Sequence, residues 1–169
     1  MERTILDSRS LGCYCCPAPC CQLQLHYYNA PANAEDIDMA RYRLLFPGTE
    51  LLVCDTGEWY LLHWKACSFF QQATYTCTVH SSEEKPRICE RFDQEECWFR
   101  CNFVDSPGES LLRMDRARFE RWSQEIRSAE TGEDLLLHSF EQSRQIVSAI
   151  PIAPLYTPLT PDDKAGAGR

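Results

Sequence analysis

The sequence has little glycine, no excess of basic residues and no long apolar run. Its seven glycines include no Gly-x-Gly or Gly-Lys-Ser pattern, so we expect no phosphate-binding loop. The formal net charge is −8, and both halves of the chain are acidic, which argues against binding to nucleic acid. No run approaches the about 18 apolar residues of a membrane-spanning helix, and residues 1–12 lack the apolar segment of a signal peptide. We therefore expect a cytoplasmic or nuclear protein.

Cysteine, in contrast, is abundant and unevenly distributed. Five of the 11 cysteines fall within one stretch of nine residues, at Cys13, Cys15, Cys16, Cys20 and Cys21. In a reducing compartment an odd number of cysteines indicates free thiols, metal ligands or acylation sites rather than a disulfide framework. Three interpretations of this cluster remain open: S-acylation, which would attach the protein to a membrane, a thiolate site for a soft metal, or an unmodified arm. Because two prolines interrupt it, we expect residues 1–21 to be an arm that folding does not require.

Alternating apolar residues follow this arm and predict about seven short strands. The turns Pro47-Gly48 and Asp55-Thr-Gly57 separate three of them. The cleanest two-residue period runs from Ala73 to Val79. The expected strands span residues 22–28, 42–46, 51–54, 58–64, 73–79, 87–90 and 97–103.

The period then changes from that of a strand to that of a helix. Ser106-Pro107-Gly-Glu109 predicts a helix start, followed by one apolar stripe of Leu112, Phe119, Trp122 and Ile126. A second helix is predicted to open at Thr131-Gly-Glu-Asp134, to carry Leu136, Phe140 and Val147, and to end at Pro151. The predicted fold class is therefore α+β, with a small antiparallel β-barrel or sandwich followed by two C-terminal helices. We expect a single domain over residues 22–150 and a disordered, proline-rich tail over residues 151–169.

This element order, with Trp122 in the middle of an amphipathic helix after the strands, resembles the pleckstrin-homology superfamily. The resemblance implies a recognition scaffold rather than an enzyme. Many members bind phosphoinositides through a lysine on the first strand and an Arg-x-Arg on the second, and Arg41-Tyr42-Arg43 resembles the latter. The lysine is missing, since the first strand offers only His26, and nearby carboxylates would repel a polyanion. Arg41 and Arg43 are therefore predicted to bind a protein rather than a lipid.

One cysteine and histidine spacing is compatible with a metal site. Cys77-x2-His80 and Cys97-x3-Cys101 would supply the four ligands that tetrahedral zinc requires. Residues three apart on a regular strand face opposite ways, so Cys77 and His80 converge only if the strand ends in a knuckle. The alternative is that these thiols fill an apolar core.

Nucleophilic catalysis by cysteine is a third hypothesis. Cys67, Cys77 or Cys89 could pair with His63 or His80, with Asp55 or Asp93 orienting the imidazole. The chain lacks a glycine-rich nucleophile elbow, and burial among aromatic residues raises the pKa of a thiol and suppresses the thiolate. We therefore do not expect an enzyme.

The proline-rich tail carries two kinds of short motif. Thr157 and Thr160 each precede a proline and are candidates for phosphorylation. Tyr156 and Leu159 form a Tyr-x-x-apolar pattern in a segment that is already extended and so docks at little entropic cost. An inert tail remains the alternative.

Together these features predict a non-enzymatic interaction or adaptor protein with a protein partner, a docking tail and no cofactor. The first alternative is a zinc-binding regulatory protein, and the second is a cysteine-dependent hydrolase. Membrane association is expected only if the N-terminal cysteines are acylated.

Overall fold

The computed structural model describes residues 18–74, 76–92, 97, 110–128 and 135–153. The chain divides into two compact units, each assembled from segments distant in the sequence. Unit 1 comprises residues 1–23, 66–107 and 154–169, and unit 2 comprises residues 24–65 and 108–153. These boundaries differ from those of the single domain expected over residues 22–150.

Unit 2 is built on a four-stranded sheet, whose first strand begins with the last residue of unit 1. The strands are β1 (Leu23–Tyr28), β2 (Thr49–Cys54), β3 (Trp59–Trp64) and β6 (Leu111–Met114), in the order β1-β3-β2-β6. The central strand β2 pairs antiparallel with both β3 and β6, and the register places Leu51 opposite Leu61 and Met114. Two further short strands, β7 (Arg127–Ser128) and β8 (Leu135–Leu136), form a separate antiparallel pair.

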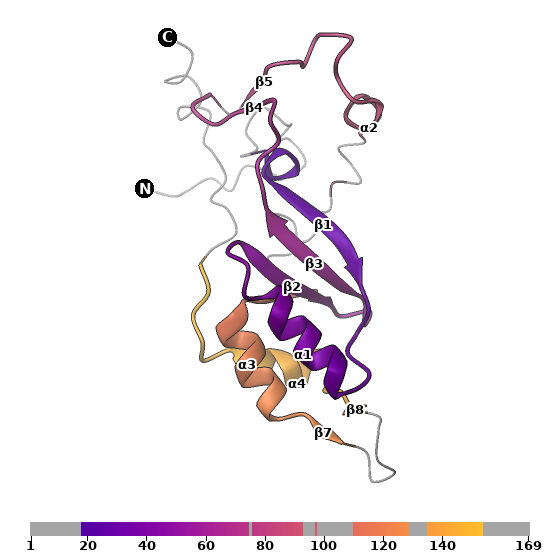
Figure 1. The fold of residues 1–169 in the computed structure, drawn as a ribbon, viewed down its shortest axis with the longest axis vertical. Helices are drawn as coiled ribbons and strands as arrows, with labels where there is room; N and C mark the ends of the chain where they lie inside the picture. Colours follow the sequence, from indigo (N-terminus) through magenta and orange to yellow (C-terminus); the bar gives the residue numbers. More distant parts are fainter. Residues whose placement is uncertain (1–17, 75, 93–96, 98–109, 129–134, 154–169) are drawn as a thin grey trace, which may run out of the picture. The chain divides into compact units, whose positions relative to one another are not determined.

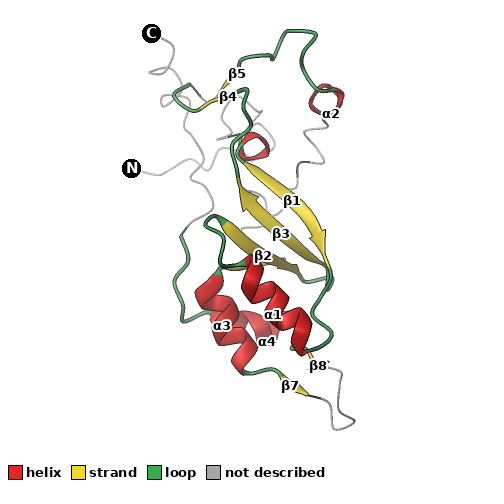
Figure 2. Ribbon diagram, in the orientation of Figure 1, coloured by secondary structure: helices red, strands yellow, loops and turns green. Residues whose placement is uncertain are grey.

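Three helices of unit 2 pack on one face of this sheet: α1 (Ala34–Arg43), α3 (Arg116–Gln124) and α4 (Phe140–Val147) (Figures 1 and 2). Each begins at a polar residue whose side chain accepts a backbone N–H of the first turn, which is the preferred chemistry at that position. Asn33 caps α1, Asp115 caps α3, and Ser139 caps α4 in a reciprocal box with Gln142.

The core of unit 2 lies between the sheet and these helices. Phe119 and Trp122 of α3 are fully buried, and the Trp122 ring lies 5.3 Å from the Trp59 ring. The indole Nε1 of Trp122 donates a hydrogen bond to Ser143 Oγ on α4 at 2.9 Å, so its polar atom is satisfied inside the core. The predicted burial of Trp122 against the sheet is therefore confirmed.

A buried ion pair lies on the opposite face of the sheet. Arg113 of β6 donates to both carboxylate oxygens of Glu50 on β2, through Nε and Nη2, each at 2.8 Å. Trp64 Nε1 on β3 donates to the same carboxylate at 3.1 Å. The remaining Arg113 nitrogen donates to the Ala153 carbonyl, and Arg118 Nε donates to the Ile150 carbonyl. The two arginines therefore anchor the segment that follows α4.

Unit 1 contains only short elements among its described residues. They are a 3₁₀ turn, η3 (Pro19–Cys21), the strands β4 (Phe70–Gln71) and β5 (Thr76–Cys77), and a one-turn helix, α2 (Arg87–Glu90). The strands β4 and β5 form an antiparallel hairpin in which Phe70 is the partner of Cys77.

The predicted α+β class is confirmed, but a barrel or sandwich is not. Among the described residues the strands form one four-stranded and two two-stranded sheets. The strand predicted at residues 42–46 is wrong, because Ile37, Ala40 and Leu44 recur at helical spacing and hold this stretch as the end of α1 and its turn. The strand predicted at 87–90 is helix α2, and among the described residues of the run 73–79 only those of β5 form a strand.

The predicted helix starts also need correction. Leu112 lies on β6 rather than on a helix, because β6 completes the sheet beside β2 and α3 begins only after Asp115. Leu136 lies on β8 rather than on the second helix, and α4 begins after Ser139, whose capping box with Gln142 marks its start; the predicted helix start at residues 131–134 lies outside the described residues. Helix α4 ends at Val147, short of Pro151.

Candidate functional site

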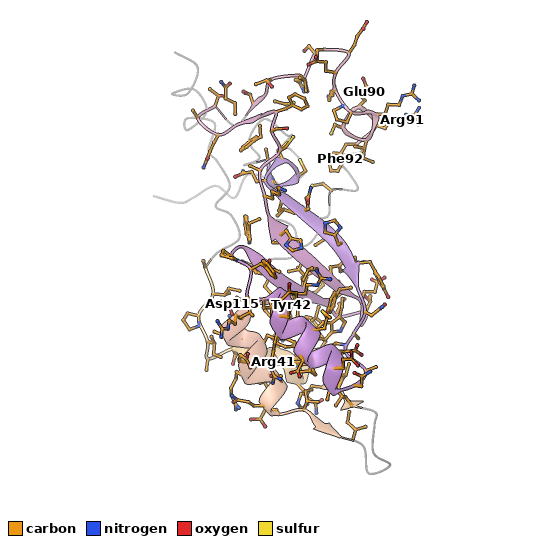
Figure 3. All side chains as sticks on the ribbon, viewed as in Figure 1. Arg41, Tyr42, Glu90, Arg91, Phe92 and Asp115 are labelled. Atoms are coloured by element: carbon orange, nitrogen blue, oxygen red, sulfur yellow. The ribbon has the colours of Figure 1, made fainter. Side chains whose placement is uncertain are left out.

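The two arginines of the predicted recognition motif lie on α1 and not on a strand. Arg41 donates to Asp38 Oδ1 at 2.8 Å, to Glu120 Oε2 at 3.2 Å and to Ser123 Oγ at 3.1 Å. It thus joins α1 to α3 (Figure 3). Three partners within the protein occupy its guanidinium, so Arg41 positions the helix and is a poor candidate for binding a ligand. Arg43 is exposed at the last position of α1.

The outward side of α1 and the turn after it expose four large apolar residues. Met39, Tyr42, Leu45 and Phe46 are 45, 52, 56 and 50 % exposed, and we call them the α1 face. The rings of Tyr42 and Phe46 touch edge to face, with centroids 5.3 Å apart. Sequence reasoning missed this surface because it assigned residues 42–46 to a strand. The spacing of residues 39, 42 and 46 is the signal that could have found it.

Cysteines form the second group of chemically reactive residues in the structure. The backbone N–H of Cys67 donates to the Cys21 carbonyl at 2.7 Å, and the N–H of Phe70 donates to the Cys67 carbonyl at 3.0 Å. Since Phe70 pairs with Cys77 across the β4–β5 hairpin, main-chain contacts connect three cysteines from separate parts of the sequence.

Cys89 on α2 interacts electrostatically with these three cysteines. Burial, followed by the charges of Cys21, Cys67 and Cys77, raises the pKa of Cys89. A hydrogen bond with the Cys20 side chain lowers the pKa of Cys21 to about 7, against the opposing effect of partial burial. Cys21 therefore has substantial thiolate character at neutral pH.

The metal site predicted at Cys77, His80, Cys97 and Cys101 is not assembled in the described part of the chain. Among those residues no three His, Cys, Asp or Glu side chains stand together closely enough to hold a metal ion. His80 Nδ1 lies 3.4 Å from Lys85 Nζ, and Cys97 is half-buried. Cys101 lies outside the described residues.

The histidines considered for cysteine catalysis have other partners. His63 Nδ1 bonds with Thr49 Oγ1 at 3.1 Å, and Lys85 Nζ approaches His80 Nδ1. Burial lowers the pKa of His63, as do the positive charges around it. Asp93 lies outside the described residues, as do the candidate modification and docking residues Cys13, Cys15, Cys16, Tyr156, Thr157, Leu159 and Thr160.

Comparisons with known proteins found no relative whose functional residues could be mapped onto this chain. No protein-family model, curated protein or solved structure matches the chain. Among the described helices none is long and apolar enough to cross a membrane. The two candidate sites are therefore the α1 face and the set of four cysteines Cys21, Cys67, Cys77 and Cys89. Both are identified from this chain's own structure.

Proposed function

We propose that the protein is a non-enzymatic interaction protein that binds a protein partner through the α1 face. The observation that carries this proposal is the exposure of Met39, Tyr42, Leu45 and Phe46 on α1 and the turn after it, with the rings of Tyr42 and Phe46 in contact. Aromatic residues and methionine are enriched at protein interfaces, and a few such anchors supply most of the binding free energy.

The packing of α1 supports a preformed surface. Its inward residues Ile37, Ala40 and Leu44 are buried, and Arg41 fixes the helix to α3. The helix cannot rotate to bury the outward residues without exposing the inward ones. Binding therefore requires little ordering of the backbone, which lowers its entropic cost.

The charge beside the α1 face indicates the kind of partner. Arg43 is exposed at the end of α1, whereas Arg41 is neutralised by Asp38 and Glu120. We infer a partner with an apolar groove that receives Tyr42 and Phe46, and with acidic residues on its rim near Arg43.

Affinity capture of the full chain, with bound proteins quantified by mass spectrometry, tests the proposal. The variant Tyr42→Ala/Phe46→Ala should lose specific partners, because each buried anchor contributes on the order of 2 kcal/mol or more. Tyr27→Ala is the matched control, since Tyr27 is an exposed aromatic residue on β1. Partners that are recovered equally with the double variant and with Tyr27→Ala would contradict the proposal.

Two further measurements separate the other outcomes. Deleting residues 154–169 should leave recovery of these partners intact. If it abolishes recovery while the double variant does not, the tail is the binding element. If sedimentation shows that the wild-type chain self-associates and the double variant is monomeric, the α1 face binds a second copy of this chain and the proposed partner is wrong.

A further inference from the structure

The backbone of unit 1 brings Cys21 and Cys67 together. The N–H of Cys67 donates to the Cys21 carbonyl at 2.7 Å, although the two residues are far apart in the sequence. Cys21 comes just before β1 and Cys67 just after β3, and these strands are hydrogen-bonded neighbours in one sheet. The fold has therefore already met the entropic cost of closing the long loop between the two cysteines.

Further backbone hydrogen bonds hold each of the two residues in place. Cys21 is the last residue of η3, where its N–H donates to the Ala18 carbonyl at 3.0 Å and the neighbouring Pro19 is buried. The Cys67 carbonyl accepts the N–H of Phe70 at 3.0 Å, at the start of β4. The juxtaposition of Cys21 and Cys67 is thus built into the described fold.

This geometry matches the separation that a disulfide requires. Opposed residues that share a backbone hydrogen bond between antiparallel strands have Cα atoms about 5.5 Å apart. Disulfides join Cα atoms that lie roughly 4.4–6.8 Å apart. The adjacent residues Cys20 and Cys21 are too close, because consecutive Cα atoms across a trans peptide bond are about 3.8 Å apart. Cys67 is therefore better placed than Cys20 to form a disulfide with Cys21.

We propose that Cys21 and Cys67 form a reversible disulfide when a hydroperoxide oxidises Cys21. Both residues are free thiols in the structure, with Cys67 exposed and Cys21 half-buried. A small peroxide and a thiol reductant can therefore reach the pair from solvent. Exposed disulfides are the ones that exchange most readily with thiols, so this bond is suited to regulation rather than to permanent cross-linking.

Cys21 reacts first because it has more thiolate character. The hydrogen bond with the Cys20 side chain lowers the pKa of Cys21 to about 7, and the thiolate is the nucleophilic form. The Cys21 sulfur attacks the terminal peroxide oxygen, so that an S–O bond forms while the O–O bond breaks. The departing alkoxide, or hydroxide in the case of hydrogen peroxide, takes a proton from solvent and leaves Cys21 as a sulfenic acid.

Cys67 then resolves this sulfenic acid. Its sulfur gives up a proton and attacks the Cys21 sulfur, so that the S–S bond forms while the S–O bond breaks. The hydroxide that leaves takes up the proton and departs as water. The two thiols together lose two electrons, which the peroxide gains.

Peroxide treatment of the reduced full-length protein tests the pair without any variant. After a stoichiometric dose of hydrogen peroxide, the remaining thiols are alkylated and the digested protein is mapped by mass spectrometry without reduction. We expect one dominant disulfide, between Cys21 and Cys67, which dithiothreitol removes. The same treatment in concentrated urea should lose this preference, because the unfolded chain no longer holds the two residues together. No disulfide, a disulfide of Cys21 with any other cysteine, or an equal yield of the same disulfide in urea would overturn the proposal.

Substitutions separate the roles of the two thiols. Cys67→Ser should lose the disulfide and accumulate a sulfenic acid at Cys21 that dimedone traps, whereas Cys21→Ser should lose both products. Cys77→Ser is the matched control, because Cys67 and Cys77 fall in the same tryptic peptide, and it should keep the disulfide in wild-type yield. If Cys77→Ser abolishes the disulfide and Cys67→Ser retains it, the proposed pair is wrong.

The disulfide also predicts a change in stability that only the wild-type chain shows. It would close a loop that contains β1, α1, β2 and β3, and such a loop restricts the unfolded chain. The urea midpoint of the oxidised wild-type protein should therefore lie above that of the reduced protein, and Cys67→Ser treated in the same way should show no shift. The α1 face contains no cysteine, so these outcomes do not decide the proposed function.

Discussion

The buried pair of Glu50 and Arg113 offers a sharp test of the energetics of unit 2. Their side chains are only 11 and 9 % exposed, and two hydrogen bonds of 2.8 Å join them. Removing one partner leaves the other charge buried and uncompensated, which costs about 3–5 kcal/mol. We therefore expect Glu50→Leu and Arg113→Met each to lower the free energy of unfolding by that amount.

The double variant should be far more stable than the sum of the two losses implies. With both charges gone, the main defect is the loss of the hydrogen bond that half-buried Trp64 Nε1 donates to Glu50, because Ala153 is exposed and water can replace Arg113 at its carbonyl. An unsatisfied buried polar group costs about 1–3 kcal/mol. The double variant should then lose roughly 1–3 kcal/mol rather than the roughly 6–10 kcal/mol of additive singles, which is a coupling of at least about 3 kcal/mol.

Urea unfolding followed by tryptophan fluorescence measures all four proteins of this cycle. The exposed pair Arg121 and Glu125, one helical turn apart on α3, supplies the control cycle. Its coupling should be about 0.5 kcal/mol or less, because solvent screens an exposed pair. If the Glu50 and Arg113 losses are additive within about 0.5 kcal/mol, the pair is effectively solvated and our account of this face is wrong.

Three other predictions follow from the core, a turn and a thiol. Trp122→Ala should lower the free energy of unfolding by about 3–5 kcal/mol, and a loss below about 1 kcal/mol in the same urea assay would contradict its packing. Gly48→Ala should be more destabilising than Gly57→Ala, since both have positive φ but a Cβ at Gly48 would lie 3.1 Å from Trp64 Cβ. In reduced, metal-free protein, alkylation of Cys21 should rise with pH and be half-maximal near its pKa of about 7, because the thiolate is the reactive form. Cys54, whose pKa is raised first by burial and then by nearby carboxylates, should react only at higher pH, and equal profiles would refute the assignment.

The sequence predicted the elements that local signals determine. The strands β1, β2 and β3 lie where alternation and the Pro47-Gly48 and Asp55-Thr-Gly57 turns indicated them. Trp122 is in the core, as its helical spacing from Phe119 indicated. In each case the residues that fix the element are neighbours in the chain.

The sequence prediction was wrong where the apolar residues fit both the two-residue period of a strand and the period of a helix. In residues 42–46 alternation indicates a strand, whereas Ile37, Ala40 and Leu44 indicate a helix, and the Asn33 cap decides for the helix. This misassignment also hid the α1 face. In a strand over residues 42–46 the side chains would alternate between two faces, whereas on the helix and its turn Tyr42 and Phe46 are exposed together. The contacts of Arg41 with Glu120 and Ser123, which are 79 and 82 positions away, show that Arg41 is used within the fold.

The division of the chain into units was not predictable from composition. At 44 % hydrophobic the whole sequence suggests one well-filled core, but that average combines a unit rich in buried apolar residues with one rich in cysteine. Cysteine itself counts as hydrophobic in the average, and so conceals how few apolar side chains are buried among the described residues of unit 1. The contact between Cys21 and Cys67 was not predictable for a related reason: a backbone hydrogen bond joins two segments that are distant in the sequence. A unit assembled from separated segments places its stabilising contacts where no local pattern records them. The proximity of Cys21, Cys67 and Cys77 in unit 1 can therefore be recognised only from the folded structure.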